Sequence, residues 1–269
     1  MPELPEVETT KNGIEPHIVG KAIAKINIHH KQLRWPIPNE IKKLQGRVSS
    51  GISRRAKYML WHFDSGSVVM HLGMSGTMRV VDNNTPLKKH DHFEVIFEDG
   101  QALRFNDPRR FGAVLWQDNN EELTILASLG PEPLSEAFDG DYLHRSLAKR
   151  KGVIKNAIMD NKVVVGVGNI YAAESLFLSG IHPKRAANKV SLQRCHALAG
   201  HIKQVLSKAI AQGGTTLKDF TQADGSPGYF AQQLHVYGRE GEACLSCDSP
   251  IKRQVIGQRS SFYCPKCQR

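Results

Sequence analysis

The chain has 269 residues, of which 36 are basic and 26 acidic, so its formal net charge is +10 and its pI is near 9.4. Hydrophobic residues make up 40% of the sequence, which is enough for buried cores and excludes a disordered chain. Excess positive charge is typical of a polyanion partner, either a nucleic acid or an acidic membrane surface. The excess lies in the second half: up to Gly140 there are 17 basic and 18 acidic residues, and from Asp141 on there are 19 and 8. This asymmetry indicates two domains with different tasks.

The N-terminal segment has neither the basic start nor the apolar run of a signal peptide. The most apolar stretch, Val163–Ile181, contains Asn169, Glu174 and three glycines, so we expect a buried helix there and no membrane span. We therefore expect a cytoplasmic protein.

In chain order, the first expected element is a helix that begins at Pro5 and ends near Gly20, because proline and acidic residues favour a helix start. Short runs rich in Val, Ile, Phe and Trp follow, separated by turn residues, and this pattern is typical of a β-sandwich or barrel. The expected strands are Ala22–Ile28, Tyr58–Phe63, Ser67–Leu72, Thr77–Val81, His92–Phe97, Ala102–Asn106 and Gly112–Gln117.

A Gly-Pro-Glu-Pro-Leu segment that ends at Leu134 predicts a domain boundary. Helical patterns follow over Asp141–Lys151, Val163–Ser179 and Ser191–Gln212, and Gly213-Gly214 ends the last of them. We expect three parts: residues 1–134, 135–235 and 236–269.

Four of the five cysteines lie in the last 26 residues, as Cys244-x2-Cys247 and Cys264-x2-Cys267. Two such pairs around a predicted β-hairpin (Ile251–Gly257 and Arg259–Tyr263) indicate one structural Zn²⁺ site, with disulfides or a redox pair as the alternative. The lone Cys195 is expected to be a packing residue. Basic residues of the hairpin suit contacts with phosphate or, equally, a solvated surface.

The N-terminus offers a second kind of chemistry. Removal of Met1 would expose Pro2 as a secondary amine, which is partly neutral at physiological pH and can attack a sugar C1′. The resulting iminium stays cationic and acidifies the neighbouring C2′ proton, while Glu3 and Glu6 could transfer protons. Glu6 could instead only stabilise the helix dipole. An intact Met1 would block this amine, so the active species is expected to lack it.

The opening Pro2-Glu3-Leu4-Pro5-Glu6-Val7-Glu8-Thr9 resembles that of the bacterial formamidopyrimidine-DNA glycosylases, which excise 8-oxoguanine. The resemblance covers the whole chain in the family's order. It is also carried by Arg54-Arg55-Ala56-Lys57-Tyr58, His71-Leu72-Gly73-Met74-Ser75-Gly76, Asp107-Pro108-Arg109-Arg110-Phe111-Gly112, Val165-Gly166-Val167-Gly168-Asn169-Ile170-Tyr171, Gln212-Gly213-Gly214-Thr215-Thr216 and the four cysteines.

The resemblance implies an α+β fold of two domains: an N-terminal β-sandwich with flanking helices, then a helix-two-turn-helix domain with a zinc-finger β-hairpin. It implies a glycosylase and AP lyase of base excision repair that removes oxidised purines and nicks the strand by β,δ-elimination. Pro2 would be the nucleophile and Glu3 the general acid. Lys57 would assist β-elimination and Arg259 δ-elimination, with Glu6 and Glu174 in or near the active site.

The resemblance also implies a set of DNA contacts. Met74, Arg109 and Phe111 match positions that fill the gap left by a flipped nucleotide, although Met74 and Phe111 could simply pack in a core. The segment from Thr215 to Tyr237 resembles the loop around the damaged base. Asn156 stands where the family usually has proline, in a segment expected to be a loop. The remaining expected contacts are Lys57, His71, His90, Arg150, Lys155, Asn169, Tyr237 and Arg259.

The expected partner is double-stranded DNA with oxidised purines or abasic sites, bound by a monomer. One alternative is a sister glycosylase for oxidised pyrimidines, which a comparison of 8-oxoguanine and thymine-glycol duplexes would distinguish. The other is a non-catalytic zinc-ribbon DNA-binding protein, which would give no covalent adduct under borohydride.

Overall fold

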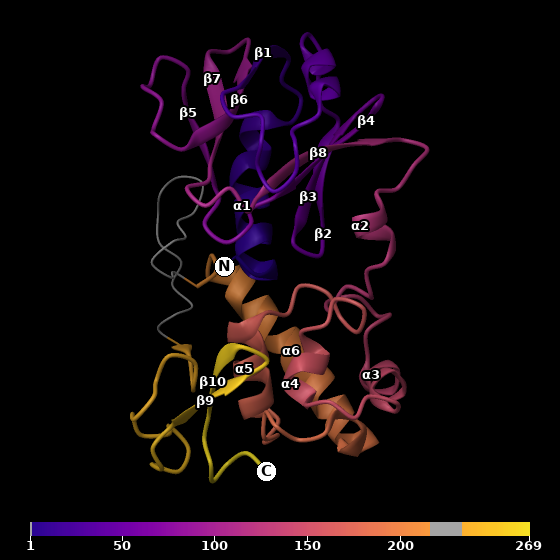
Figure 1. Ribbon diagram of the computed structural model, residues 1–269, viewed down its shortest axis with the longest axis vertical. Coiled ribbons are helices and arrows are strands. Elements are labelled where there is room, and N and C mark those ends of the chain that lie inside the picture. Colours follow the sequence, from indigo (N-terminus) through magenta and orange to yellow (C-terminus); the bar gives the residue numbers. More distant parts are fainter. Residues whose placement is uncertain (1, 216–232) are drawn as a thin grey trace. The chain divides into compact units, whose positions relative to one another are not determined.

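The computed structural model describes residues 2–215 and 233–269, and its helices and strands are labelled in Figure 1. The described residues divide into two compact units. The first contains residues 2–127 and 212–215, and the second contains residues 128–211 and 233–269. We describe each unit by itself. The limits expected for three separate domains stay a prediction.

The first unit is a β-sandwich with a helix at the chain's start. One sheet has the strand order β1-β6-β7-β5 and the other β2-β3-β4-β8, with antiparallel neighbours throughout. The expected sandwich is therefore confirmed. Its elements are α1 (Leu4–Ile18), β1 (Ile23–Ile28), η1 (Asn39–Leu44), β2 (Gly51–Arg55), β3 (Tyr58–Phe63), β4 (Gly66–His71), β5 (Thr77–Asp82), β6 (Asp91–Phe97), β7 (Gln101–Asn106), β8 (Ala113–Asp118) and α2 (Thr124–Ala127).

The core of this unit joins both sheets and the helix. Trp61 from one sheet and Phe93 and Phe105 from the other are almost completely buried in one apolar cluster. Helix α1 adds Val7 and Ile14 to the same cluster. Burying side chains of this size stabilises a fold by about 1.5–3 kcal/mol each. The core therefore holds the two sheets and α1 in a fixed arrangement, which positions the loops at their edges.

The second unit is mainly helical and ends in a β-hairpin. Helix α5 is buried over most of its length and packs against α6, which also packs against α3. The hairpin strands agree with those expected between the cysteine pairs. The elements are α3 (Gly140–Leu147), α4 (Ile154–Ile158), α5 (Asn169–Leu178), η2 (Ala187–Lys189), α6 (Leu192–Ala211), β9 (Lys252–Ile256) and β10 (Arg259–Tyr263).

The helix expected from Val163 begins only at Asn169. Gly166 has a φ of +80°, which interrupts a right-handed helix, and Gly168 is the extended N-cap residue. The valines before them are buried in irregular backbone, with the Val165 N–H donating to the Pro131 carbonyl at 3.2 Å. A continuous apolar run does not distinguish a helix from such a buried loop.

Two further expectations need correction. Strand β2 was not expected, because it has a single large apolar residue, Ile52, and lies at the edge of its sheet. Asn156, expected in a loop, lies in the first turn of α4, where its exposed amide contacts the backbone of Gly257. Within the described ranges, no helix is both long and apolar enough to cross a membrane.

Candidate nucleophile, pocket and metal centre

The start of α1 is a reciprocal cap built from two glutamates. Glu3 is the N-cap residue and its carboxylate accepts the backbone N–H of Glu6, while Glu6 Oε2 accepts the Glu3 N–H at 2.8 Å. Pro2, Glu3 and Glu6 are all buried, the two glutamates to 98% and 97%. The cap fixes the direction in which Pro2 and Glu3 leave the helix.

Glu6 also holds a second segment of the first unit. Its Oε1 accepts the Thr215 N–H at 2.9 Å, and a Cβ added to Gly214 would lie 3.1 Å from the same oxygen. Gly214 has a φ of +81°, a conformation that favours glycine. Each oxygen of Glu6 therefore accepts a backbone N–H, which gives this carboxylate a structural task. Of the segment expected to surround a damaged base, residues 216–232 lie outside the described residues.

Lys57 lies in the tight turn between β2 and β3. The preceding residue, Ala56, is buried and has a φ of +54°, which is uncommon for a residue other than glycine. Arg54 stabilises the turn by donating from Nη1 to the Ala56 carbonyl at 2.9 Å and from Nε to Glu8 at 2.6 Å. Because Glu8 lies on α1, this ion pair connects the Lys57 turn to the helix that begins beside Pro2.

The three residues expected to fill a gap in DNA lie together at a pocket of about 670 Å³ in the first unit. The Arg109 guanidinium lies 4.9 Å from the Phe111 ring centroid, and Phe111 is 47% exposed. Exposure favours a binding role for Phe111 over core packing. The pocket is lined by Gln32, Leu33, Arg34, His71, Gly73, Met74, Arg109, Arg110 and Phe111.

Two turns come very close together at this pocket. A Cβ on Gly73 would lie 2.4 Å from the Gly112 nitrogen, so only glycine permits the approach. Asp107, fully buried, joins the same two turns: its carboxylate accepts the Gly112 N–H at 2.8 Å and the Ser75 hydroxyl at 3.1 Å. The sequence motif around Asp107 does not reveal this role, because only the folded chain brings Ser75 to it.

His71 ends strand β4 beside this pocket. Its Nδ1 accepts the Gly73 N–H at 3.0 Å, and its ring packs 4.8 Å from that of Tyr58. Burial, with the positive charges of Lys57 and Arg34, lowers the pKa of His71 to about 4. The ring is therefore neutral at physiological pH and carries its proton on Nε2, so it can donate one hydrogen bond to a phosphate but brings no charge.

His90 and Arg150 lie in different units. His90 directly precedes β6, and its carbonyl accepts the Asp107 N–H at 3.0 Å. Arg150 in the second unit pairs with Asp160 at 2.8 Å, where both side chains are about one-third exposed. Hydrogen bonds from the Lys162 N–H and from Arg150 lower the pKa of Asp160 despite partial burial. An exposed pair of this kind contributes little stability, so Arg150 can exchange Asp160 for another anion at small cost.

Lys155 and Asn169 face the hairpin inside the second unit. Lys155 is 1% exposed, and its Nζ donates to Asn169 Oδ1 and to Ser261 Oγ, both at 2.5 Å. The Asn169 amide in turn donates to the Ser260 carbonyl at 2.9 Å. Arg259, the first residue of β10, has an exposed side chain.

Glu174, on helix α5, holds the segment that leads into the cysteine module. Its Oε1 accepts the N–H groups of Val236 and Tyr237 at 3.0 and 2.9 Å, and its Oε2 accepts the His235 N–H at 2.7 Å. The carboxylate is 1% exposed. Tyr237 packs edge-on against Phe262 of the hairpin at 5.1 Å. Glu174 thus fixes Tyr237 through its backbone.

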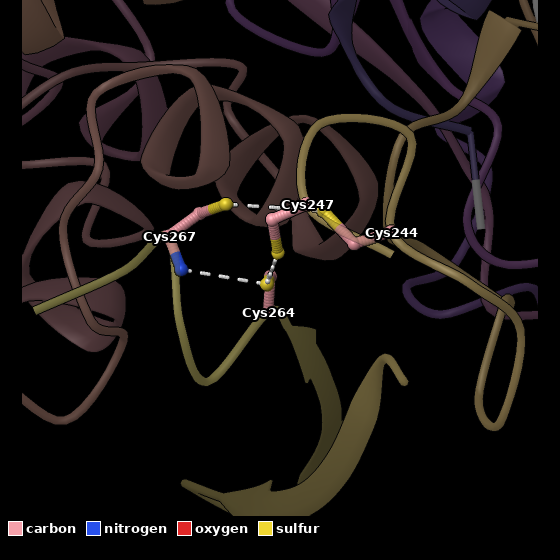
Figure 2. A group of neighbouring side chains, drawn as sticks. All are labelled: Cys244, Cys247, Cys264 and Cys267. Carbon is pink, nitrogen blue, oxygen red and sulfur yellow. Dashed lines mark hydrogen bonds between the residues drawn. The ribbon is translucent and has the colours of Figure 1, made fainter. Parts of the chain in front are cut away.

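The four cysteines of the last 26 residues converge, as Figure 2 shows. Their sulfur atoms all lie within 4.8 Å of one another, with Cys244–Cys267 and Cys247–Cys264 separations of 3.9 and 3.4 Å. All five cysteines of the chain are free thiols. Four thiolates at such separations fit one tetrahedral Zn²⁺ and leave no position for a substrate, so the site is suited to structural zinc. Cys195 is buried elsewhere, and burial raises its pKa to about 11.

Comparisons with known proteins agree along the chain. Residues 1–114 match the formamidopyrimidine-DNA glycosylase N-terminal domain, residues 129–221 match the H2TH domain of that enzyme, and residues 241–269 match a zinc finger found in FPG and IleRS. The formamidopyrimidine-DNA glycosylase of Alteromonas mediterranea is 54% identical over 269 residues, covering 100% of both chains.

Solved structures give the same result. An FPG variant from Lactococcus lactis, crystallised with DNA that contains Fapy-dG, is 34% identical with a TM-score of 0.93 and covers 100% of both chains. The Lactococcus lactis Fpg in complex with DNA containing an abasic site is also 34% identical, with a TM-score of 0.93 over 99% of each chain. The expected α+β fold, with its sheet domain, H2TH domain and zinc-finger hairpin, is confirmed.

Proposed function

The chain belongs to the formamidopyrimidine-DNA glycosylase family, whose members are glycosylases with AP lyase activity that repair oxidised purines, and on that premise we propose how its own residues do this. Pro2 is the nucleophile and Glu3 the general acid. The observation that carries the proposal is the reciprocal Glu3–Glu6 cap, which holds both groups at one helix start.

Base removal begins with the neutral Pro2 nitrogen attacking C1′ of the damaged nucleotide. The new N–C1′ bond replaces the bond from C1′ to the base, which leaves as an anion and takes up the proton that the attacking amine loses. The nitrogen lone pair freed in this way then forms a C1′=N iminium as the C1′–O4′ bond breaks. Glu3 supplies the proton that O4′ takes up in this step.

Strand cleavage follows from the positive charge of the iminium. Loss of the C2′ proton expels the 3′-phosphate, and later loss of the C4′ proton expels the 5′-phosphate. Lys57 assists the first elimination, supported by the Arg54–Glu8 pair that fixes its turn. Arg259 assists the second by pairing with the departing phosphate. Glu6 and Glu174 act as positioning residues, because their carboxylates accept backbone N–H groups.

The partner is double-stranded DNA with oxidised purines or abasic sites, bound by a monomer. Met74, Arg109 and Phe111 take the place of the flipped nucleotide, for which the exposed Phe111 ring and the adjacent guanidinium are suited. His71 contributes a neutral Nε2–H donor. Binding weakens steeply with salt, since the charge excess contacts phosphate. A substrate of this kind supports a location in the bacterial cytoplasm, on the chromosome. His90, Arg150 and Asn169 contact the DNA backbone, and Lys155 and Tyr237 lie near the damaged base.

The experiment that tests this function compares two duplexes, one with a single 8-oxoguanine opposite cytosine and one with thymine glycol opposite adenine. Under single-turnover conditions we expect 8-oxoguanine to be excised at least about tenfold faster, as specific pockets discriminate by their polar contacts. Glu3→Gln is the control for contaminating glycosylases, and we expect it to excise neither 8-oxoguanine nor thymine glycol. Faster excision of thymine glycol would show an enzyme for oxidised pyrimidines, and binding without excision would show a non-catalytic protein.

A further inference from the structure

Lys155 is a buried cation with no task in the chemistry above. Its side chain is 1% exposed, and its Nζ donates to Asn169 Oδ1 and Ser261 Oγ, both at 2.5 Å, and to the Ser260 carbonyl at 3.3 Å. An ammonium group has N–H donors and no acceptor, so a buried lysine is stable only where polar acceptors surround it. Because burying a charge without such partners is costly, these acceptors hold well-defined positions.

Ser261 extends the contact from this lysine to Arg259, the arginine proposed for δ-elimination. Its hydroxyl, in a side chain that is 1% exposed, accepts from Lys155 Nζ and donates to the Arg259 carbonyl at 3.3 Å. The next carbonyl, that of Ser260, is held by both Lys155 and the Asn169 amide. The two successive carbonyls of Arg259 and Ser260, at the start of β10, are therefore held by side-chain hydrogen bonds.

The hairpin turn that precedes Arg259 needs such support. Gly257 and Gln258 have φ values of +55° and +62°, as in a two-residue type I′ turn. The backbone of Gln258 is therefore left-handed, a conformation that residues other than glycine adopt less readily. Asn156 packs against Gly257 so closely that a Cβ there would lie 2.7 Å from its amide. The Arg259 side chain is exposed, but the backbone that carries it is held in place by Asn156 of α4 and by the buried Lys155.

We propose that Ser261 is a positioning residue for δ-elimination. Lys155 holds the Ser261 hydroxyl, and this hydroxyl holds the Arg259 carbonyl. The two contacts fix the backbone from which the Arg259 side chain reaches the 5′-phosphate. The inference rests on the role proposed for Arg259 above. A small misplacement of a catalytic group lowers rate strongly, whereas the first elimination does not depend on Arg259. Loss of the hydroxyl should therefore change the product of the lyase reaction more than its rate of initiation.

The test measures the ratio of δ- to β-elimination product from a single abasic duplex, together with the rate of borohydride trapping. In Ser261→Ala we expect the ratio to fall by about three- to tenfold, as for loss of one hydrogen bond in a buried network, with trapping within about twofold of wild type. Ser261→Thr keeps the hydroxyl and restores the ratio. Both products arise from the same covalent adduct, so the ratio does not depend on the fraction of folded protein.

Ser260→Ala is the matched control, because its hydroxyl accepts only from Arg253 on the hairpin surface and its carbonyl is retained. We expect a wild-type ratio in it. Should the Ala variant of Ser261 fold poorly, Ser261→Val compared with Ser261→Thr removes the hydroxyl at constant volume.

Arg259→Ala separates the two levels of the proposal. A wild-type ratio in Arg259→Ala would overturn the role of Arg259 and this inference with it. A lost δ product in Arg259→Ala beside a wild-type ratio in Ser261→Ala would overturn the inference alone. An equal fall in Ser260→Ala and Ser261→Ala would also overturn it, since the effect would then belong to the hairpin in general.

Discussion

The depressed pKa of His71 predicts a pH-dependent stability of the first unit. The pKa is about 4 in the folded chain against an ordinary 6.5, because the ring is buried beside Lys57 and Arg34. The unfolded chain therefore binds the proton more strongly, so His71 favours folding above pH 6.5 and this contribution is lost as pH falls towards 4. Between pH 7 and pH 5 the loss is about 2 kcal/mol.

Urea unfolding followed by tryptophan fluorescence measures this loss directly, since Trp35, Trp61 and Trp116 all lie in the first unit. His71→Asn is the comparison, because its amide oxygen can accept the Gly73 N–H at the place of Nδ1 but does not titrate. We expect the free energy of unfolding to fall about 2 kcal/mol more in wild type than in this variant between pH 7 and pH 5. An equal fall in both proteins would refute the assignment of a neutral, buried imidazole.

Three further predictions concern the supports of the site. Asp107→Asn should lower the free energy of unfolding of the first unit by about 2 kcal/mol in the same urea assay, because the buried carboxylate joins two turns. Asp64→Asn, at an exposed position, should leave this free energy unchanged, and an equal effect of both variants would contradict the prediction. Arg54→Met should slow β-elimination on preformed abasic DNA by about tenfold. Glu8→Gln should slow it less, because Arg54 contacts both Glu8 and the Ala56 carbonyl in the Lys57 turn. Equal rates in the two variants would contradict this prediction. Metal analysis should give one Zn²⁺ per chain, and chelation should abolish DNA binding while preserving tryptophan emission from the first unit; full binding without metal would exclude a structural zinc.

Elements bounded by clear turn residues could be predicted from the sequence. Apart from β2, the strands of the sandwich and the zinc-finger hairpin agree with the expected ranges within one or two residues, because glycine, aspartate and asparagine mark their ends. Strand β2 could not be predicted, since Arg54 and Arg55 give it no apolar alternation and its pairing is supplied by β3. The late start of α5 at Asn169 depends on positive φ at Gly166, which an apolar run conceals.

The candidate site divides in the same manner. The cysteine pairs and the capping glutamates are local in sequence, so their spacing alone indicates zinc and a helix start. The tasks of Asp107 and Ser261 depend on partners 32 and 106 residues away, Ser75 and Lys155, which only the tertiary fold brings near. The neutral state of His71 is likewise a consequence of burial, which a lone histidine in a sequence does not reveal.

The central claim is that the Pro2 nitrogen forms the covalent bond to DNA. Borohydride reduction of the protein on abasic DNA, followed by peptide mass spectrometry, locates that bond. We expect the adduct on an N-terminal peptide that begins at Pro2, no adduct in Pro2→Gly at comparable DNA affinity, and none on protein in which Met1 is intact. An adduct on a lysine peptide, or full activity of protein with Met1 proven present, would contradict the account.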